Sequence, residues 1–172
     1  MLNLTRDDGY QLSDDPGRLD VDRVHHWLST DAYWALGRPR ELLLRAIDGS
    51  TAYGVYAPDG EQVAFARVVT DGATFGWLCD VYVQPAARGR GLARWLVGVV
   101  RDRLDRLGVR RILLATWDAH GVYAEVGFTA LTNPGQWMEL ILREIPDRTG
   151  TDPVTPITRK EATPGLPLTV ER

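Results

Sequence analysis

The chain has 172 residues, which suits one domain with a sizeable core. Its formal net charge of −3 gives no basic footprint, and no apolar run approaches the roughly 18 residues of a membrane span. We therefore expect neither a nucleic acid nor a membrane as partner, and an N-terminus without a signal-peptide pattern favours a cytoplasmic protein.

The first half of the chain predicts two helices followed by an antiparallel meander. Val21, Val24 and Leu28 fall on one helical face. The turns Pro58-Asp59-Gly60 and Asp71-Gly72 join three strands in sequence. The predicted elements, in chain order, are a strand over 9–13, a helix over 20–29, an aromatic loop over 31–38, a helix over 39–47, and strands over 51–57, 61–70 and 73–83.

The last strand of the meander runs directly into a glycine loop and a helix. The sequence here is Val81-Tyr82-Val83-Gln84-Pro85-Ala86-Ala87-Arg88-Gly89-Arg90-Gly91-Leu92-Ala93. The first amides of a helix have no partner within it, and glycines let such a backbone approach a phosphate closely. Arg88 and Arg90 add positive charge. The stretch therefore predicts a phosphate cradle, with an exposed basic turn as the alternative.

Spacing excludes two familiar phosphate loops at this position. No lysine follows the glycines as a nucleotide P-loop requires. Arg94 stands where a dinucleotide fingerprint needs its third glycine. The residues Ala86-Ala87-Arg88-Gly89-Arg90-Gly91 instead resemble the acyl-CoA loop of the GNAT N-acetyltransferases, Gln/Arg-x-x-Gly-x-Gly/Ala, and depart from it only in the first position.

The second half of the chain predicts a helix, a buried strand, a short helix and two closing strands. Asp118 can cap the short helix, and Gly127 can end it in a left-handed conformation. From Pro146 onward prolines and threonines dominate, so we expect a domain over 1–145 and an extended tail over 146–172. The predicted elements are a helix over 91–107, a strand over 109–117, a short helix around Tyr123, and strands over 128–131 and 136–143.

A second segment also resembles the GNAT family. It reads Ala119-His120-Gly121-Val122-Tyr123-Ala124-Glu125-Val126-Gly127-Phe128, and the family has a short helix here that ends in apolar-Tyr-x-x-x-Gly-Phe. The two motifs and the element order resemble the family over about residues 20–143. The resemblance implies an α+β fold, the GNAT fold, with a mixed, mostly antiparallel sheet of six to seven strands flanked by about four helices.

The resemblance implies an acetyl-CoA-dependent N-acetyltransferase that acts on a small-molecule primary amine without a metal. The amine attacks the acetyl carbonyl directly in a ternary complex, at a gap where two strands splay apart. The implied cofactor contacts are the backbone of Val81 and Val83 with the pantetheine arm, the loop residues Arg88, Gly89, Arg90, Gly91, Leu92 and Ala93 with the pyrophosphate, and Thr116 and Asp118 elsewhere along acetyl-CoA.

Tyr123 matches the family residue that donates a proton to the departing thiolate. A phenol with a pKa of about 10 is protonated at neutral pH and can donate. The alternative is a tyrosine packed on the end of its helix. Two alternatives to the enzyme as a whole differ in class: a catalytically silent acyl-CoA-binding sensor on the same fold, or a nucleotide-binding protein that uses the same loop.

Asp80 and His120 are the two candidates for the general base. Asp80 is predicted to share a sheet face with Tyr82, with Cys79 pointing away from it. Asp80 could bind the acceptor ammonium, relay its proton, or form a salt bridge to an arginine such as Arg67 or Arg111. His120 lies one helical turn before Tyr123, and histidine is the residue type most often used as a general base, although a surface histidine fits equally well.

The acceptor is expected beside the aromatic loop. Tyr33 and Trp34, with Asp31 and Arg38 nearby, suit a cationic amine through cation–π contact and ion pairing. The same aromatic residues could instead form a hydrophobic plug, and Trp137 is open to both interpretations. Amino sugars, polyamines, amino acids, aminoglycoside-like drugs and protein N-termini all remain as acceptors, and a homodimer is left open.

Overall fold

A six-stranded mixed sheet in the order β1-β2-β3-β4-β5-β6 forms the centre of the molecule. Neighbouring strands pair antiparallel except β5 and β6, which are parallel. A computed structural model describes residues 1–142, so the predicted tail over 146–172 lies outside the described residues. The strands are β1 (Asn3–Thr5), β2 (Gln11–Ser13), β3 (Thr51–Tyr56), β4 (Gln62–Thr70), β5 (Phe75–Val83) and β6 (Arg111–Leu113).

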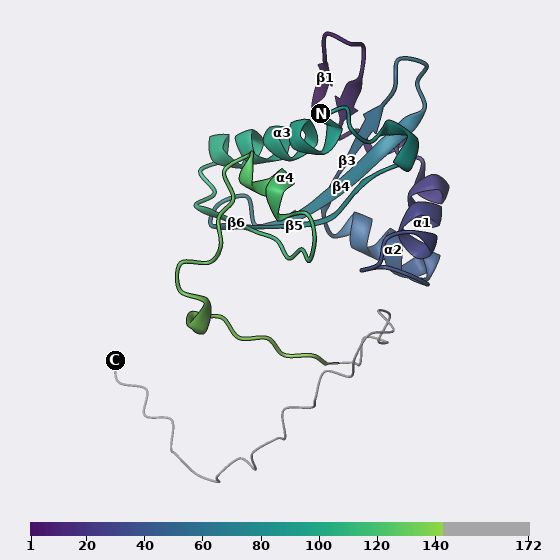
Figure 1. The fold of residues 1–172 in the computed structure, drawn as a ribbon. Coiled ribbons are helices and arrows are strands. Elements are labelled where there is room, and N and C mark those ends of the chain that lie inside the picture. The colour runs from purple at the N-terminus through teal and green to yellow at the C-terminus, as the bar shows by residue number, and fades with distance from the viewer. Residues whose placement is uncertain (143–172) are drawn as a thin grey trace, which may run out of the picture.

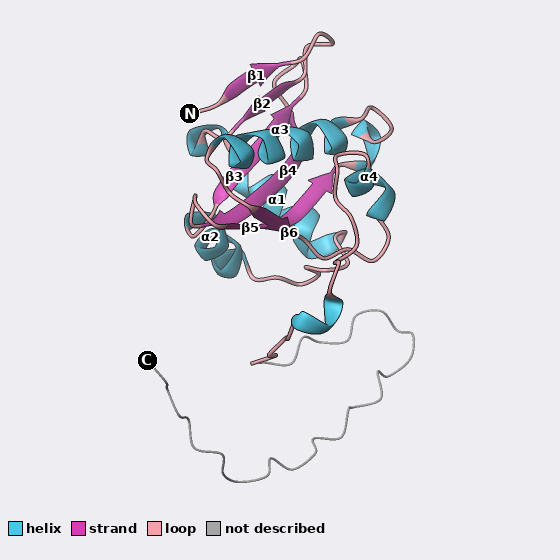
Figure 2. Ribbon diagram, turned by 90° about the vertical axis from the view of Figure 1, so that its left-hand side faces the viewer, coloured by secondary structure: helices cyan, strands magenta, loops and turns pink. Residues whose placement is uncertain are grey.

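Helices cover both faces of the sheet (Figure 1 and Figure 2). On one face α3 packs Leu96, Val100 and Leu104 against buried side chains of β3, β4 and β5, and α4 lies beside α3. On the other face α1 and α2 pack against Phe65 and Tyr82. The helices within the described residues are α1 (Val21–Thr30), α2 (Arg40–Asp48), α3 (Leu92–Arg106) and α4 (His120–Ala124).

These observations confirm the predicted fold class, and local signals explain most of the element boundaries. Asp20 caps α1 by accepting from the Arg23 amide at 3.0 Å. Pro39 occupies the N-cap of α2. None of the helices in residues 1–142 is long and apolar enough to cross a membrane.

The two predicted closing strands do not form within the described residues. Residues 128–142 contain no strand, and Pro134–Gln136 form a short 3₁₀ turn instead. The segment therefore leaves the outer edge of β6 without a partner strand in the described part of the chain. Strand-forming side chains do not make a strand unless a neighbouring strand pairs with them, so the prediction for this segment was wrong.

The predicted strand over 109–117 is also shorter and more exposed than expected. β6 covers only Arg111–Leu113, with Arg111 exposed and the next two residues half-buried. It lies at the edge of the sheet rather than between two neighbours, so its apolar composition does not reflect burial on both faces. The short length of β6 has a functional consequence, because it leaves most of β5 with a free edge.

A β-bulge in β5 redirects the chain at Asp80. Arg67 pairs with Cys79 and Phe65 pairs with Tyr82, so two residues of β5 stand opposite the single residue Ala66. Asp80 has a φ of 54°, the only positive φ of a non-glycine residue in the described chain. As predicted, Asp80 lies on the Tyr82 side of the sheet.

The same bulge makes one prediction wrong. Cys79 is the cross-strand partner of Arg67, whose side chain reaches Asp80, so Cys79 and Asp80 lie on the same side of the sheet. Simple alternation would have placed Cys79 on the opposite side. The extra residue of the bulge breaks the two-residue period at this point.

Candidate active site

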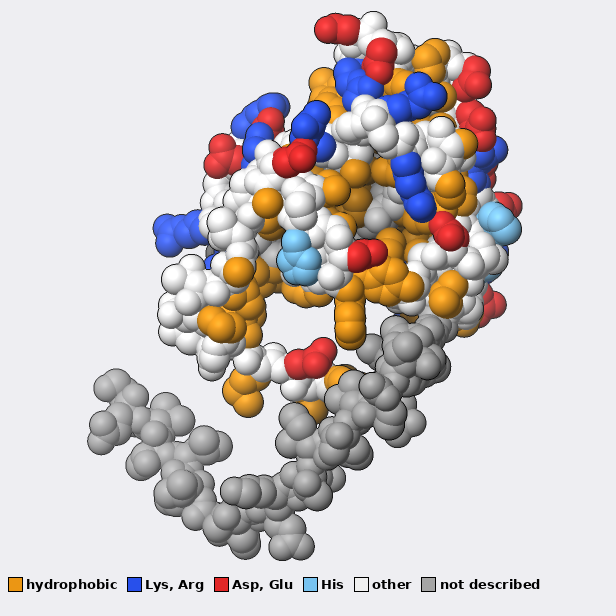
Figure 3. Space-filling model, viewed as in Figure 1, with side chains coloured by type: hydrophobic (Ala, Val, Ile, Leu, Met, Phe, Trp, Pro, Cys, Tyr) orange, Lys and Arg blue, Asp and Glu red, His pale blue; other side chains and the backbone are white. Residues whose placement is uncertain are grey.

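The phosphate-loop motif and the tyrosine motif meet around one cavity of about 730 Å³. Its walls come from β5, the loop before α3, the start of α3, α4 and the loop after α1. The figure of the molecular surface shows hydrophobic side chains gathered around the middle of the face that carries α4 (Figure 3). We call this space the donor cavity, because most of the residues predicted to hold acetyl-CoA line it.

Backbone groups dominate the loop end of the donor cavity. Gly89 and Gly91 have φ of 76° and 71°, a region that favours glycine. Gly91 is the N-cap of α3, and the first backbone hydrogen bond after it runs from the Trp95 amide to the Gly91 carbonyl at 3.0 Å. The amides of Leu92 and Ala93 therefore precede the hydrogen-bonded part of the helix and suit an anion.

The free edge of β5 forms a second backbone surface of the donor cavity. β6 pairs with β5 only at Phe75, Gly76 and Trp77 and ends there, so from Leu78 onward this edge of β5 has no partner strand in the described chain. Val81 and Val83 line the cavity on this unpaired part. A gap lies beside this part of β5 as predicted, but it arises because β6 ends at Leu113 and not because two strands diverge.

Arg88 occupies part of this edge. Its Nε donates to the Val83 carbonyl at 2.9 Å, and its guanidinium also donates to Asp31 at 3.3 Å. One of the two acceptor positions of the Val83 carbonyl is therefore already occupied by Arg88. Arg94, which the sequence analysis did not assign, also lines the cavity and forms an exposed ion pair with Glu125 at 2.8 Å.

A smaller cavity of about 260 Å³ adjoins the donor cavity. Both cavities are lined by Tyr33, Trp34, Val81, Asp118, Ala119 and Tyr123, so the two spaces meet at these residues. The smaller cavity adds Trp77, Cys79, Asp80, Thr116 and Trp117, among others. We call it the acceptor cavity, since it lies beside the aromatic loop and is continuous with the donor side.

Tyr123 is half-buried at the junction of the two cavities. Its ring makes an edge-on contact with Phe128, with the ring centroids 5.9 Å apart. Burial, with smaller contributions from Tyr33 and Asp118, raises the pKa of Tyr123 to about 12. The phenol is therefore a proton donor throughout the neutral range.

Asp80 is buried in a network with three donors. Arg38 donates to both carboxylate oxygens at 2.7 and 3.1 Å, Arg67 donates at 2.6 Å, and the Trp34 indole donates at 3.2 Å. Burial by itself would raise the pKa of Asp80, but the two guanidiniums outweigh it and hold the pKa below its ordinary value. The salt bridge to Arg67 that was one of the predicted alternatives is thus present, together with one to Arg38.

The remaining predicted residues lie in different places. His120 is exposed and lines neither cavity. Arg90 contributes its carbonyl to Arg6 and does not line the donor cavity. Thr116 lies in the acceptor cavity, where its hydroxyl accepts from the Ala119 amide at 3.1 Å.

Asp118 lines both cavities but does not cap the short helix. The N-cap position of α4 is Ala119, without a side-chain hydrogen bond. The capping prediction was therefore wrong. The prediction for the other end of the helix is confirmed, because Gly127 has a φ of 97°.

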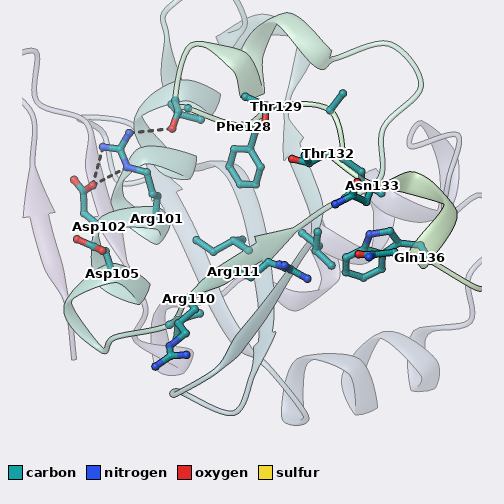
Figure 4. Close-up of a pocket in the computed structure, with 18 residues that line it drawn as sticks. Arg101, Asp102, Asp105, Arg110, Arg111, Phe128, Thr129, Thr132, Asn133 and Gln136 are labelled. Carbon is teal, nitrogen blue, oxygen red and sulfur yellow. Dashed lines mark hydrogen bonds and ion pairs between the residues drawn. The ribbon is translucent and has the colours of Figure 1, made fainter.

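A third cavity, of about 490 Å³, lies away from these residues between the end of α3, β6 and the segment after α4 (Figure 4). Arg101 closes one side by donating to the Val126 carbonyl at 3.0 Å. On the other side the Arg111 guanidinium lies 5.5 Å from the centre of the Trp137 ring. Trp137 thus belongs to this third cavity and not to the acceptor cavity.

The sequence and the fold were compared with known proteins. The sequence model of the Acetyltransferase (GNAT) family matches residues 21–128. A protein of Gibberella zeae that is named as an acetyltransferase is 35% identical over 135 residues, which cover 67% of this chain and 76% of the relative.

Solved structures of acetyltransferases also share the fold of this chain. The crystal structure of a GNAT-family acetyltransferase from Xanthomonas campestris is 45% identical, has a TM-score of 0.73, and covers 83% of this chain and 97% of its own. N-acetylglutamate synthase from Neisseria gonorrhoeae, solved with coenzyme A and N-acetyl-glutamate, shares the fold at a TM-score of 0.61 and 20% identity, covering 74% of this chain and 30% of that one. The chain therefore belongs to the GNAT family of acetyltransferases.

Proposed function

We propose that the protein transfers the acetyl group of acetyl-CoA to the primary amine of a small molecule, by direct attack in a ternary complex. The observation that carries this proposal is the junction of two cavities at Tyr123 and Val81. One cavity offers the backbone groups that suit a pyrophosphate and an extended arm. The other offers a separate approach to the same point, as two substrates present together require.

The donor cavity fits acetyl-CoA through groups of this chain. The amides at the start of α3 face a site that glycines keep open, and an added Cβ at Gly89 would meet no atom within 4 Å. We assign the pyrophosphate to residues 88–93 and the pantetheine arm to the free edge at Val81 and Val83. Arg94, which lines the same cavity, is an additional candidate for phosphate contact.

Acetyl transfer to an amine has two chemical requirements. The acceptor amine must be neutral to attack the acetyl carbonyl, and the sulfur that leaves benefits from a proton. We assign the second task to Tyr123, because its pKa of about 12 keeps it protonated and it lies where the cavities meet. The amine forms a bond to the acetyl carbon as the carbon–sulfur bond breaks, and the sulfur takes up a proton.

Neither predicted base is well placed to remove the amine proton. The Asp80 carboxylate already accepts from two arginines and an indole, which lowers its pKa and makes it a weak base. His120 is exposed and outside both cavities. We therefore assign proton removal to water.

Asp80 then has a positioning role. A non-glycine residue at a φ of 54° is strained, and such a conformation persists only where surrounding contacts fix it. The two arginines and Trp34 supply those contacts from β4 and from the loop after α1. By fixing the bulge, they set the direction of β5 where Val81 meets the donor cavity.

An amine screen tests this function. Acetyl-CoA is incubated with the protein and a panel of small primary amines, free thiol release is measured, and mass spectrometry identifies an N-acetylated product. We expect acetyl-CoA to raise the melting temperature because it binds only the folded state. If acetyl-CoA binds with this effect but no amine is acetylated, the protein is a silent acyl-CoA-binding module and the proposed reaction is wrong.

A further inference from the structure

The acceptor cavity gathers tryptophans from three separate elements. Trp34 comes from the loop after α1, Trp77 from β5, and Trp117 from the loop after β6, and all three line the cavity. Their side chains remain 41%, 38% and 80% exposed. Large apolar side chains that share one exposed surface indicate a binding site more strongly than scattered ones do.

Two contacts connect Trp34 and Trp117 through Tyr33. The Tyr33 and Trp34 rings meet edge-on with their centroids 4.9 Å apart. The Trp117 amide donates to the Tyr33 hydroxyl at 3.2 Å, which ties the loop after β6 to the loop after α1. Since Trp34 also bonds Asp80, the aromatic walls are connected to the network that fixes the bulge.

The charged side chains that line the cavity are both acidic. Asp80 and Asp118 line it, and no arginine, lysine or histidine is among its lining residues in the described chain. Asp80 is already neutralised by Arg38 and Arg67. Asp118 is exposed, and its carboxylate makes no hydrogen bond or ion pair within residues 1–142, so it is the group available for a cation.

We propose that the acceptor is an arylalkylamine, a primary amine joined by a short alkyl linker to a flat aromatic group. This inference rests on the proposed function and names its substrate class. The aromatic group stacks on the tryptophan surface, and the ammonium is attracted to Asp118 before it loses its proton. Asp118 lines both cavities, so this places the nitrogen at the junction with the donor side.

The same lining disfavours two other classes of amine. An amino acid would bring its carboxylate toward Asp80 and Asp118 with no cationic side chain in the lining to pair with it. An amino sugar would bury several hydroxyls, whereas Asp80 and Thr116 are already engaged in hydrogen bonds. Burying hydroxyls without partners costs free energy.

A matched panel tests the substrate class. Acetylation is measured with 2-phenylethylamine, tryptamine, phenylalanine, glucosamine and spermidine at fixed acetyl-CoA. We expect kcat/KM for 2-phenylethylamine to exceed that for phenylalanine, which differs by a carboxylate, by at least about tenfold. Glucosamine or spermidine as the best substrate would overturn the inference and leave the proposed function intact.

Tryptophan variants connect the preference to this cavity. Trp77→Ala and Trp117→Ala should each raise the KM for 2-phenylethylamine by about tenfold and leave the KM for acetyl-CoA unchanged. Trp137→Ala is the matched control for Trp77→Ala. Trp137 is 41% exposed and Trp77 is 38% exposed, but Trp137 lines the third cavity. An equal rise in KM in all three variants, or in none, would refute the proposed aromatic site.

Binding separates this inference from the proposed reaction. Quenching of tryptophan fluorescence by 2-phenylethylamine is measured with coenzyme A present, so that no turnover occurs. The site is supported if Trp77→Ala weakens the quenching and Trp137→Ala preserves it. This result would support the site even if no amine is acetylated, and only the proposed reaction would then fail. If no quenching and no acetylation of 2-phenylethylamine occur, the inference is wrong.

Discussion

The donor and acceptor cavities share the residues where they meet but differ in the groups that each adds beyond that junction. Beyond the junction the donor cavity adds mainly residues of the stretch 81–94, with α4 and the loop after α1 against it. The acceptor cavity uses side chains from β5, the loop after α1 and the loop after β6. Backbone recognition of a phosphate and an extended arm tolerates many side chains, whereas recognition of the acceptor depends on which side chains the fold collects.

This difference has a consequence for mutations. On the donor side the sensitive positions are glycines, where any side chain strains the backbone or fills the space. On the acceptor side the sensitive positions are side chains, and their loss affects one substrate more than the other. The following variants test that contrast, beginning with the largest expected effect.

Gly91→Val should abolish the rise in melting temperature caused by acetyl-CoA. The valine would strain a backbone with a φ of 71° and add bulk where the pyrophosphate is assigned. The control is Gly72→Val in the turn between β4 and β5, where the φ is also 71° and an added Cβ meets no atom within 4 Å. Both variants should lower the melting temperature without ligand, and only Gly72→Val should retain the shift with acetyl-CoA.

A full shift in folded Gly91→Val would remove this loop from the donor site. Loss of the shift in both variants would mean that backbone strain, wherever it lies, prevents binding. The comparison therefore separates the local effect on the phosphate site from the general cost of a left-handed valine.

Tyr123→Phe should lower kcat by about 10²-fold, the low end for a lost general acid, and leave acetyl-CoA binding unchanged. The measurement is single-turnover acetyl transfer, so that product release does not hide the effect. Tyr56→Phe is the control, because Tyr56 lies in β3 and its buried hydroxyl has no hydrogen-bond partner within residues 1–142. Single-turnover rates of Tyr123→Phe within twofold of the parent would exclude the proton-donor role.

Asp80→Ala should cost roughly 3–5 kcal/mol of unfolding free energy, because it leaves two arginines without their carboxylate and removes a buried ion pair. Asp80→Gly relieves the strain at a φ of 54° and also lacks the charge. If Asp80 positions the bulge, Asp80→Gly should retain more kcat than Asp80→Ala. Equal loss of kcat in both, in folded proteins, would indicate that the charge itself acts in the reaction.

The lowered pKa of Asp80 also predicts a pH dependence. Because the pKa of Asp80 is lower in the folded protein than in the unfolded chain, its ionisation stabilises the fold at pH values above the unfolded pKa of about 3.9. This stability is lost as the pH falls through the lower pKa of the folded state. Asp80 therefore stays ionised over the neutral range, and Asp80→Asn should remove stability there without removing an acidic limb from the pH profile of kcat. If Asp80→Asn did remove the acidic limb, Asp80 would be the general base and its assignment as a positioning residue would be wrong.

His120→Ala should have the smallest effect, with kcat/KM within twofold of the parent. The imidazole is exposed and lines neither cavity. The pH profile of kcat/KM is the measurement that decides, since a catalytic histidine would give an acidic limb that disappears in the variant. Such a disappearance would assign the base to His120 and contradict proton removal by water.

The sequence by itself determined the elements whose signals are local. The strand, glycine loop and helix around 81–107 follow from residues that are neighbours in the chain, as does the glycine that ends α4. Most of the residues predicted to contact the cofactor line the donor cavity, whereas Arg90 and Thr116 do not, and Arg94 and the contact of Arg88 with Val83 were not predicted.

Tertiary structure decided what local signals could not carry. The bulge at Asp80 depends on the register of β4 against β5, and it changed the side on which Cys79 lies. The segment after Phe128 has strand-forming residues, yet in the described part of the chain it finds no strand to pair with.

The acceptor side is the clearest case of a site that only the fold assembled. Trp34, Trp77 and Trp117 are more than 30 positions apart along the chain, and no periodicity or spacing connects them. Arg38 and Arg67 reach Asp80 from equally separate segments. A sequence motif consists of residues that are close together in the chain. A cavity lined by side chains forms when distant elements pack together, so its residues can be identified only from the folded structure.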